Sequence, residues 1–223
     1  MKTLFRQNIY YFITIFILII SGGLILLFSS KEGFSLWVNA RYSGLMDIVI
    51  LGINQIGTVW FNALIVILLW LWKGWKTALQ GASCFAVTVL VIAFFKYVVF
   101  PGTPRPTVLF EGREILRLIE GVVQLKTESF PSGHTASAFS IATVLAFLLP
   151  GKQYHWLLAL AAALVGYGRI YLSQHFITDV YAGMIIAVIV STFIYWWMER
   201  VLHINNPVQP EVITNKNIHP STS

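Results

Sequence analysis

Long apolar runs separated by short polar segments make up most of this chain. A helix needs about 20 apolar residues to cross a bilayer core of about 30 Å, so runs of this length indicate membrane-spanning helices. Six runs reach or approach it: residues 10–28, 48–72, 78–100, 135–149, 156–172 and 180–198. The fourth and fifth are short, but each adjoins a polar motif that can extend its helix. The pattern predicts an all-α, polytopic membrane protein, a bundle of six transmembrane helices.

Two of these runs need a closer reading. Lys2 and Arg6 precede the first run, as in a signal peptide, but the run exceeds the usual 7–15 apolar residues and no A-x-A-like cleavage site follows it. We therefore predict a retained first span. The second run contains Asn54, Gln55 and Asn62. These side chains either hydrogen-bond between helices or are ordinary residues that face the bundle.

Two regions lie outside the runs. In the long loop 101–130, Ile115, Leu118, Ile119 and Val122 recur at helical spacing, which predicts a short amphipathic helix within 112–125. This helix either lies on the membrane surface or caps the bundle. The polar tail 205–223 contains three prolines and is predicted to be disordered. Residues 1–204 then form a single membrane domain.

Composition narrows the class of protein further. Hydrophobic residues make up 57% of the 223 residues and charged residues only 11%, against about 25% in a soluble domain. The net charge of +6 comes from dispersed basic residues, which argues against a nucleic-acid partner. Cys84, the single cysteine, lies in an apolar run and is predicted to be a small core residue without an intramolecular disulfide. No pattern indicates the oligomeric state.

The distribution of Lys and Arg favours one orientation. Leaving aside the three cations of the motifs below, seven lie on the N-terminal side of the predicted bundle and five on the other side. Basic loops stay in the cytoplasm, so both termini are predicted to be cytoplasmic in the plasma (inner) membrane. All the polar motifs then lie at helix ends on the outer, periplasmic side.

The first of these motifs is Pro131-Ser132-Gly133-His134, where the long loop becomes an apolar helix. Ser132 is a favourable N-cap, and Gly133 lets a ligand approach the backbone closely. Free N–H groups and the positive end of the helix dipole favour an anion there. A helix start that happens to include a histidine is the alternative reading.

The second motif joins a histidine to a carboxylate. His175 and Asp179 are four residues apart, so they share a face if both are helical. A carboxylate beside an imidazole selects its tautomer and raises its basicity, which suits a nucleophile or general base. Arg169, at the end of the fifth run, requires an anionic partner in the membrane. A purely structural His–Asp pair is the alternative.

The third motif supplies two further cations. Lys96 lies near the end of the third run, where a lysine can also simply snorkel to the interface. Arg105 stands between Pro104 and Pro106 on a stiff backbone, from which a guanidinium can hold a phosphate through two hydrogen bonds. Three cations, two histidines and one carboxylate make a candidate phosphate site.

Together the three motifs resemble the signature of the type-2 phosphatidate phosphatase superfamily, which includes membrane lipid phosphatases and vanadium-dependent haloperoxidases. The resemblance covers about residues 78–198. Two departures stand out. Eight residues separate Lys96 from Arg105, where the family commonly has six, and Gly168 replaces the usual serine before Arg169.

The resemblance implies a role for each residue. His175 attacks phosphorus and forms a phosphohistidine, Asp179 stabilises the imidazolium, and His134 protonates the leaving group. The phosphate-binding residues are Lys96, Arg105, Ser132, Gly133 and Arg169. The cations take the place of a metal, so no metal or other cofactor is expected.

These inferences predict an integral-membrane phosphatase whose substrate is a membrane lipid mono- or diphosphate. The resemblance implies undecaprenyl diphosphate, phosphatidylglycerophosphate, phosphatidate or a lipid A phosphate as candidates. A phosphoryl transferase between membrane lipids would use the same phosphohistidine but exclude water. The apolar runs count against a haloperoxidase, and the two histidines count against a transporter or scaffold.

Overall fold

The computed structural model describes residues 1–113 and 116–202, and these are helical and irregular with no strand among them. The helices are α1 (Lys2–Gln7), α2 (Ile9–Phe28), α3 (Lys31–Asn39), α4 (Gly44–Asn54), η1 (Gln55–Gly57), α5 (Val59–Lys73), α6 (Trp75–Phe94), η2 (Phe95–Val99), α7 (Pro106–Leu109), α8 (Gly133–Leu148), η3 (Lys152–Tyr154), α9 (Trp156–Tyr171) and α10 (Ile177–Val201). The all-α class is thus as predicted. The tail 205–223, predicted to be disordered, lies outside the described residues.

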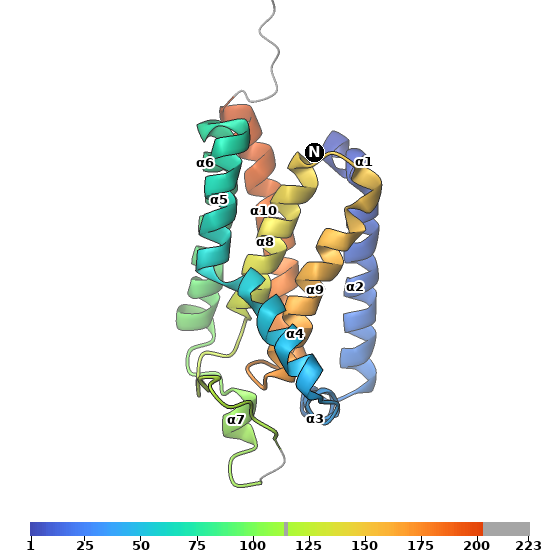
Figure 1. Ribbon diagram of the computed structural model, residues 1–223, viewed down its shortest axis with the longest axis vertical. Coiled ribbons are helices and arrows are strands. Elements are labelled where there is room, and N and C mark those ends of the chain that lie inside the picture. The colour runs from blue at the N-terminus through green and yellow to red at the C-terminus, as the bar shows by residue number, and fades with distance from the viewer. Residues whose placement is uncertain (114–115, 203–223) are drawn as a thin grey trace, which may run out of the picture.

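Helix α8 forms the centre of the bundle, with α6, α9 and α10 packed around it (Figure 1). Twelve of its sixteen residues are buried. Its sequence is rich in Ala, Ser and Thr, whose small side chains let neighbouring helices approach closely. The first turn of α8, which carries the predicted anion site, is therefore surrounded by helices on several sides.

Three helical segments are long and apolar enough to cross a bilayer: Ile9–Phe28, Trp75–Val99 and Ile177–Val201. Counted as one span, the bent pair formed by α3 and α4 gives a fourth, and α5 and α8 are apolar but shorter. Helices that can span a membrane are thus present as expected, whereas the count of six spans stays a prediction.

The second predicted span, 48–72, is wrong as a single helix. Helix α4 ends at Asn54, a 3₁₀ turn follows, and α5 begins after Thr58. The Thr58 hydroxyl caps α5 by accepting a hydrogen bond from the N–H of Phe61, and its backbone is extended. Helix α4 also folds back on α3 at 119°. The break falls at the mostly polar residues 54–58, where capping and tertiary packing outweigh the apolar residues on either side.

The predicted amphipathic helix in 112–125 is also wrong, for the part that the structure describes. Residues 116–119 are not helical, and positions 114 and 115 lie outside the described residues. Gly112 and Gly121 have φ of +76° and +80°, which interrupts helical geometry. The only helix found among the described residues of the loop is the four-residue α7.

Tertiary contacts determine the shape of this loop. The side chain of Asn39 donates to the carbonyl of Arg117 and accepts from its N–H, each at 2.9 Å. The Arg117 guanidinium pairs with Asp47 on α4. Ile119 and Val122 pack against a buried cluster that includes Ile170 and Leu172. Ile119 and Val122 thus pack on the bundle, which agrees with the second of the two readings left open, whereas Leu118 is half exposed.

Candidate active site

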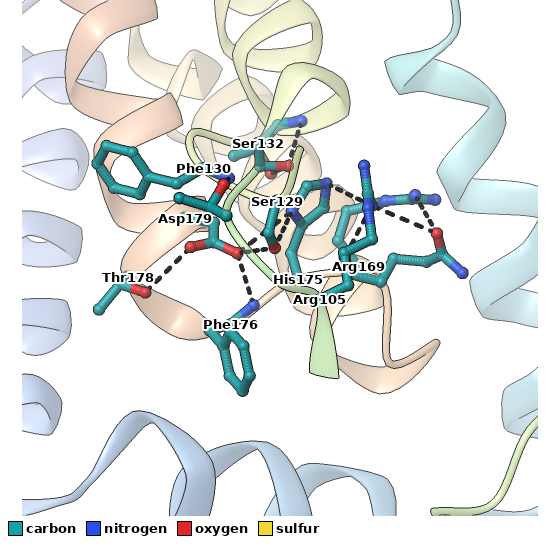
Figure 2. Close-up of polar contacts among 12 residues, drawn as sticks. Arg105, Ser129, Phe130, Ser132, Arg169, His175, Phe176, Thr178 and Asp179 are labelled. Carbon is teal, nitrogen blue, oxygen red and sulfur yellow. Dashed lines mark hydrogen bonds and ion pairs between the residues drawn. The ribbon is translucent and has the colours of Figure 1, made fainter. Parts of the chain in front are cut away.

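The three motifs meet at one end of the bundle, where Figure 2 shows their side chains converging. Arg105 precedes α7, Ser132 precedes α8, and Arg169 lies in the last turn of α9. His175 lies in the turn between α9 and α10, and Asp179 lies in the first turn of α10. Segments far apart in the sequence therefore build one cluster of polar side chains, which we call the pocket.

His175 and Asp179 form the centre of this pocket. Nδ1 of His175 lies 3.3 Å from Oδ2 of Asp179, and both side chains are buried. Nε2 of His175 lies 3.4 Å from Nη1 of Arg105. A guanidinium only donates hydrogen bonds, so Nε2 accepts and Nδ1 carries the ring proton. This tautomer directs the unprotonated nitrogen toward the arginine.

The Asp179 carboxylate is oriented by several donors besides His175. It accepts hydrogen bonds from the Ser129 hydroxyl, from the N–H of Phe176 at 2.9 Å and from the Thr178 hydroxyl at 3.1 Å. Asp179 is the third residue of α10, so its carboxylate caps the N–H of Phe176, the residue before the helix. The helix end thus fixes the carboxylate that in turn fixes the histidine.

Burial lowers the pKa of His175 below its ordinary value, and the nearby Arg169 and Arg105 add to this effect. Asp179 opposes the shift because it favours the charged imidazole. Desolvation is the largest cause. The imidazole is consequently neutral near pH 7, as attack on phosphorus requires.

Arg105 is buried and bonded to backbone carbonyls rather than to a carboxylate. Its Nε donates to Thr127 O at 2.9 Å, Nη1 to Gln174 O at 2.8 Å, and Nη2 to Glu128 O at 3.2 Å. None of the ion pairs found among residues 1–113 and 116–202 includes Arg105 or Arg169. These carbonyls orient the guanidinium and leave its positive charge unneutralised.

Arg169 is held in a similar way by neutral side chains. Nη1 lies 3.4 Å from Oδ1 of Asn54, and Nη2 lies 3.4 Å from Oε1 of Gln174. Its Nε is buried and has no hydrogen-bond partner. A buried cation with an unsatisfied donor is costly unless an anion approaches it. Two buried guanidinium groups beside one imidazole thus make a strong site for an oxyanion.

Lys96 reaches the same pocket despite the two extra residues that follow it. Its Nζ donates to Glu128 O at 2.7 Å, and Arg105 donates to the same carbonyl. Both side chains line a cavity of about 490 Å³. Residues Phe95–Val99 form a π-helical turn, which holds one more residue than an α-helical turn. This turn and the bend at Gly102 accommodate the longer spacing.

Helix α8 begins after Ser132, the predicted N-cap, and the anion site predicted at its first turn stays a prediction. The Ser132 hydroxyl accepts from the Thr135 hydroxyl at 2.9 Å, and its backbone N–H donates to Asp179 O at 2.9 Å. A Cβ placed on Gly133 would meet nothing within 4 Å, so its backbone is open to a ligand. His134 is half-buried and lines a cavity of about 210 Å³.

All eight predicted site residues thus lie at this end of the bundle, and their predicted roles stay predictions. Two other side chains in the pocket, Ser129 and Gln174, were not predicted, and Asn54 was predicted only to hydrogen-bond between helices or to face the bundle. Ser129 and Gln174 are polar neighbours of the motifs, which is a weak signal. Asn54 lies more than a hundred residues from its partner Arg169, and only the fold brings the two together.

Comparison with known proteins agrees with this geometry. A lipid A 4'-phosphatase of Porphyromonas gingivalis is 35% identical over 88 residues, which are 38% of this chain and 37% of that protein. The undecaprenyl-diphosphatase BcrC of Bacillus subtilis is 26% identical over 154 residues, which are 68% of this chain and 75% of that protein. This chain thus spans little more than a third of the first relative.

Solved structures support the same relationship. The crystal structure of Aquifex aeolicus LpxE has a TM-score of 0.62 at 29% identity, over 72% of this chain and 92% of that chain. A PAP2-type phosphatidylglycerolphosphate phosphatase from Bacillus subtilis shares the fold, with a TM-score of 0.64 at 20% identity over 90% and 98%. The model of the PAP2 superfamily matches residues 77–202, more than half of this chain. The chain therefore belongs to the PAP2 superfamily.

Proposed function

We propose that this chain is an integral-membrane lipid phosphatase that hydrolyses a lipid mono- or diphosphate. The observation that carries the proposal is the setting of His175. One ring nitrogen faces Asp179 at 3.3 Å, and the other faces Arg105 at 3.4 Å. Arg169 lies near the same imidazole, and Lys96 donates to the Glu128 carbonyl that Arg105 also contacts. Such a histidine is suited to attack a phosphoryl group that the cations hold.

In the first step, Nε2 of His175 forms a bond to phosphorus as the bond to the leaving oxygen breaks. Asp179 stabilises the imidazolium that forms, because its carboxylate faces the protonated Nδ1. His134 donates a proton to the leaving oxygen. Lys96, Arg105, Arg169, Ser132 and the Gly133 backbone bind the equatorial oxygens, on which charge is spread in the transition state.

In the second step, water attacks the phosphohistidine and His134 accepts a proton from it. The P–N bond breaks, phosphate leaves, and His175 returns to its neutral form. Each residue then has the protonation state with which it began. Three cations supply the charge stabilisation, so the proposed cycle has no step that requires a metal ion.

The surroundings of His134 favour a lipid as the leaving group. Its cavity is lined by Val59 of α5, by Val89 and Ile92 of α6, and by Ala136. An apolar chain attached to the departing oxygen fits such a lining. The named activities of the relatives in P. gingivalis and B. subtilis point to lipid A phosphates and undecaprenyl diphosphate as the first substrates to test. We place the site on the periplasmic side, with both termini in the cytoplasm.

Phosphate release by detergent-purified protein tests the proposal, with a panel of lipid phosphates and a chelator present. Wild-type protein is expected to release phosphate without an added acceptor lipid, whereas a phosphoryl transferase would not. His175→Ala is expected to abolish release. His155→Ala is the matched control, since His155 is also buried but bonds to the Pro150 carbonyl at the start of α9. Activity of His175→Ala within tenfold of wild type would remove it from the mechanism.

A further inference from the structure

Asn54 contributes to the phosphate pocket from outside the segment that matches the family model. It is the last residue of α4, is only 5% exposed, and lies well before residue 77, where the match begins. Its amide has a defined orientation. Nδ2 donates to the carbonyl of Ile50 at 2.9 Å, which leaves Oδ1 facing Nη1 of Arg169 at 3.4 Å.

The residue before Arg169 leaves room for this amide. A Cβ placed on Gly168 would lie 2.2 Å from Nδ2 of Asn54 and 3.3 Å from its Cγ. A separation of 2.2 Å does not occur between non-bonded atoms, so any larger residue at 168 would have to displace the Asn54 side chain. Cγ2 of Ile50, at 3.2 Å, would need to move only slightly. Gly168 and Asn54 therefore occupy one space between α9 and α4, and each depends on the other.

The charge of the partner matters as much as its shape. The amide oxygen of Asn54 is a neutral acceptor, so it orients the guanidinium without neutralising it. A carboxylate in the same place would pair with Arg169 and compete with a phosphate for it. The second acceptor of this guanidinium, Oε1 of Gln174, is also neutral. Both contacts leave Arg169 available for an anion.

We propose that Asn54 is a positioning residue, which holds the Arg169 guanidinium toward the phosphate while leaving its charge free, and that Gly168 is present to admit it. This inference deepens the proposed function at the same site. It does not require hydrolysis, because it concerns the binding of an oxyanion and the packing of two side chains.

The first test is a double-substitution cycle read by unfolding temperature in detergent. Gly168→Ser alone is expected to lower this temperature by about 2–10 °C, because it forces a collision in a packed interior. Asn54→Ala together with Gly168→Ser is expected to recover most of that loss, because the alanine vacates the space that the serine needs. If the double variant loses the sum of the two single-variant losses in unfolding temperature, the two side chains do not compete for one space and the proposal is wrong.

The second test measures the affinity for orthovanadate through its effect on the unfolding temperature. Asn54→Ala is expected to weaken binding about five- to tenfold, through loss of one hydrogen bond to a charged group. Asn54→Asp keeps the shape but adds a negative charge against Arg169, so it is expected to weaken binding further, by more than about tenfold. A purely structural role predicts that Asn54→Asp weakens orthovanadate binding less than Asn54→Ala, since aspartate is closer than alanine to asparagine in shape.

Asn8→Ala is the matched control. Asn8 is also buried and donates to the carbonyl four residues earlier, but it lies between α1 and α2. It is expected to alter stability without altering orthovanadate affinity. Binding by Asn54→Asp equal to wild type, or no binding by wild type itself, would overturn the inference. If wild type and the Asn54 variants bind orthovanadate as expected but no lipid phosphate is hydrolysed, only the proposed function is contradicted.

Discussion

At the scale of the residue, the main feature of the site is the burial of two arginine side chains. Arg105 and Arg169 are buried and surrounded by neutral oxygen atoms, and one of their donors has no partner. A buried cation in this state costs several kcal/mol, which an oxyanion in the pocket offsets. We therefore expect the groups whose burial is costly to supply the affinity of the site for phosphate.

His134 is the residue whose role is most open to a chemical test. We expect His134→Ala to impair lipids with alkoxide leaving groups far more than an activated aryl phosphate, because an aryl oxide departs with little protonation. The measurement is kcat/KM for both substrates with purified protein. An equal loss on both would argue against a general-acid role.

Lys96 lies close enough to the cations of the pocket to bind phosphate. Lys96→Met keeps much of the apolar stem and removes the charge. Loss of one charge-assisted hydrogen bond costs about 1.5–3 kcal/mol, so kcat/KM is expected to fall roughly 10–150-fold. Lys126→Met is a suitable control, since Lys126 lines the same cavity but pairs with exposed Glu111. A change below threefold in Lys96→Met would mean that this lysine only snorkels.

At the scale of the element, apolar runs predict helices well where nothing interrupts them. The runs 10–28 and 156–172 differ by at most one residue from α2 and α9 at either end, because no cluster of polar residues or cap divides either run. The motif residues were also predictable, since each lies at a helix end on one side. The contacts of Asn54, Ser129 and Gln174 were not, because they depend on how distant helices pack.

The two errors at this scale have the same physical origin. The run 48–72 is mostly apolar, yet the Thr58 cap and the bend of α4 against α3 divide it next to its polar residues Asn54 and Gln55. The loop 112–125 has helical periodicity, yet Asn39 and Asp47 hold Arg117 in an irregular conformation. The hydrophobic pattern of a segment gives only a weak preference for a helix. Buried hydrogen bonds and ion pairs to other elements outweigh that preference.

The capping role of the loop gives a prediction for neighbouring residues. Ile119 packs against the buried cluster beneath the loop, whereas Leu118 is half exposed. Ile119→Ser is expected to lower the unfolding temperature and to reduce activity on long-chain and short-chain phosphates alike. Leu118→Ser is expected to change both quantities little. A rise in KM confined to long-chain substrates in Ile119→Ser would instead indicate that the loop guides the lipid.

At the scale of the whole molecule, the arrangement of the helices fits a lipid environment. Apolar side chains of α2, α5 and α6 are largely exposed on the outside of the bundle, and α8 is enclosed within it. Figure 1 places the loop that carries α7 and the turn between α8 and α9 at opposite ends. The pocket lies at the same end of the bundle as the loop that carries α7. The orientation of the protein in the membrane therefore decides on which side of the membrane the pocket lies.

Labelling of single cysteines in intact cells tests this orientation. Cys84 is the only cysteine and is buried, so Cys84→Ser gives a cysteine-free background that keeps a hydrogen-bond donor. Cysteines are then introduced one at a time at exposed Glu120, in the loop, and exposed Gln153, in the turn between α8 and α9. A membrane-impermeant maleimide is expected to label Glu120→Cys in intact cells and Gln153→Cys only after lysis, because the excess of basic residues favours a cytoplasmic location for the second end. The reverse pattern would place the pocket in the cytoplasm, and labelling of both positions in intact cells would mean that the two ends do not lie on opposite sides of the membrane.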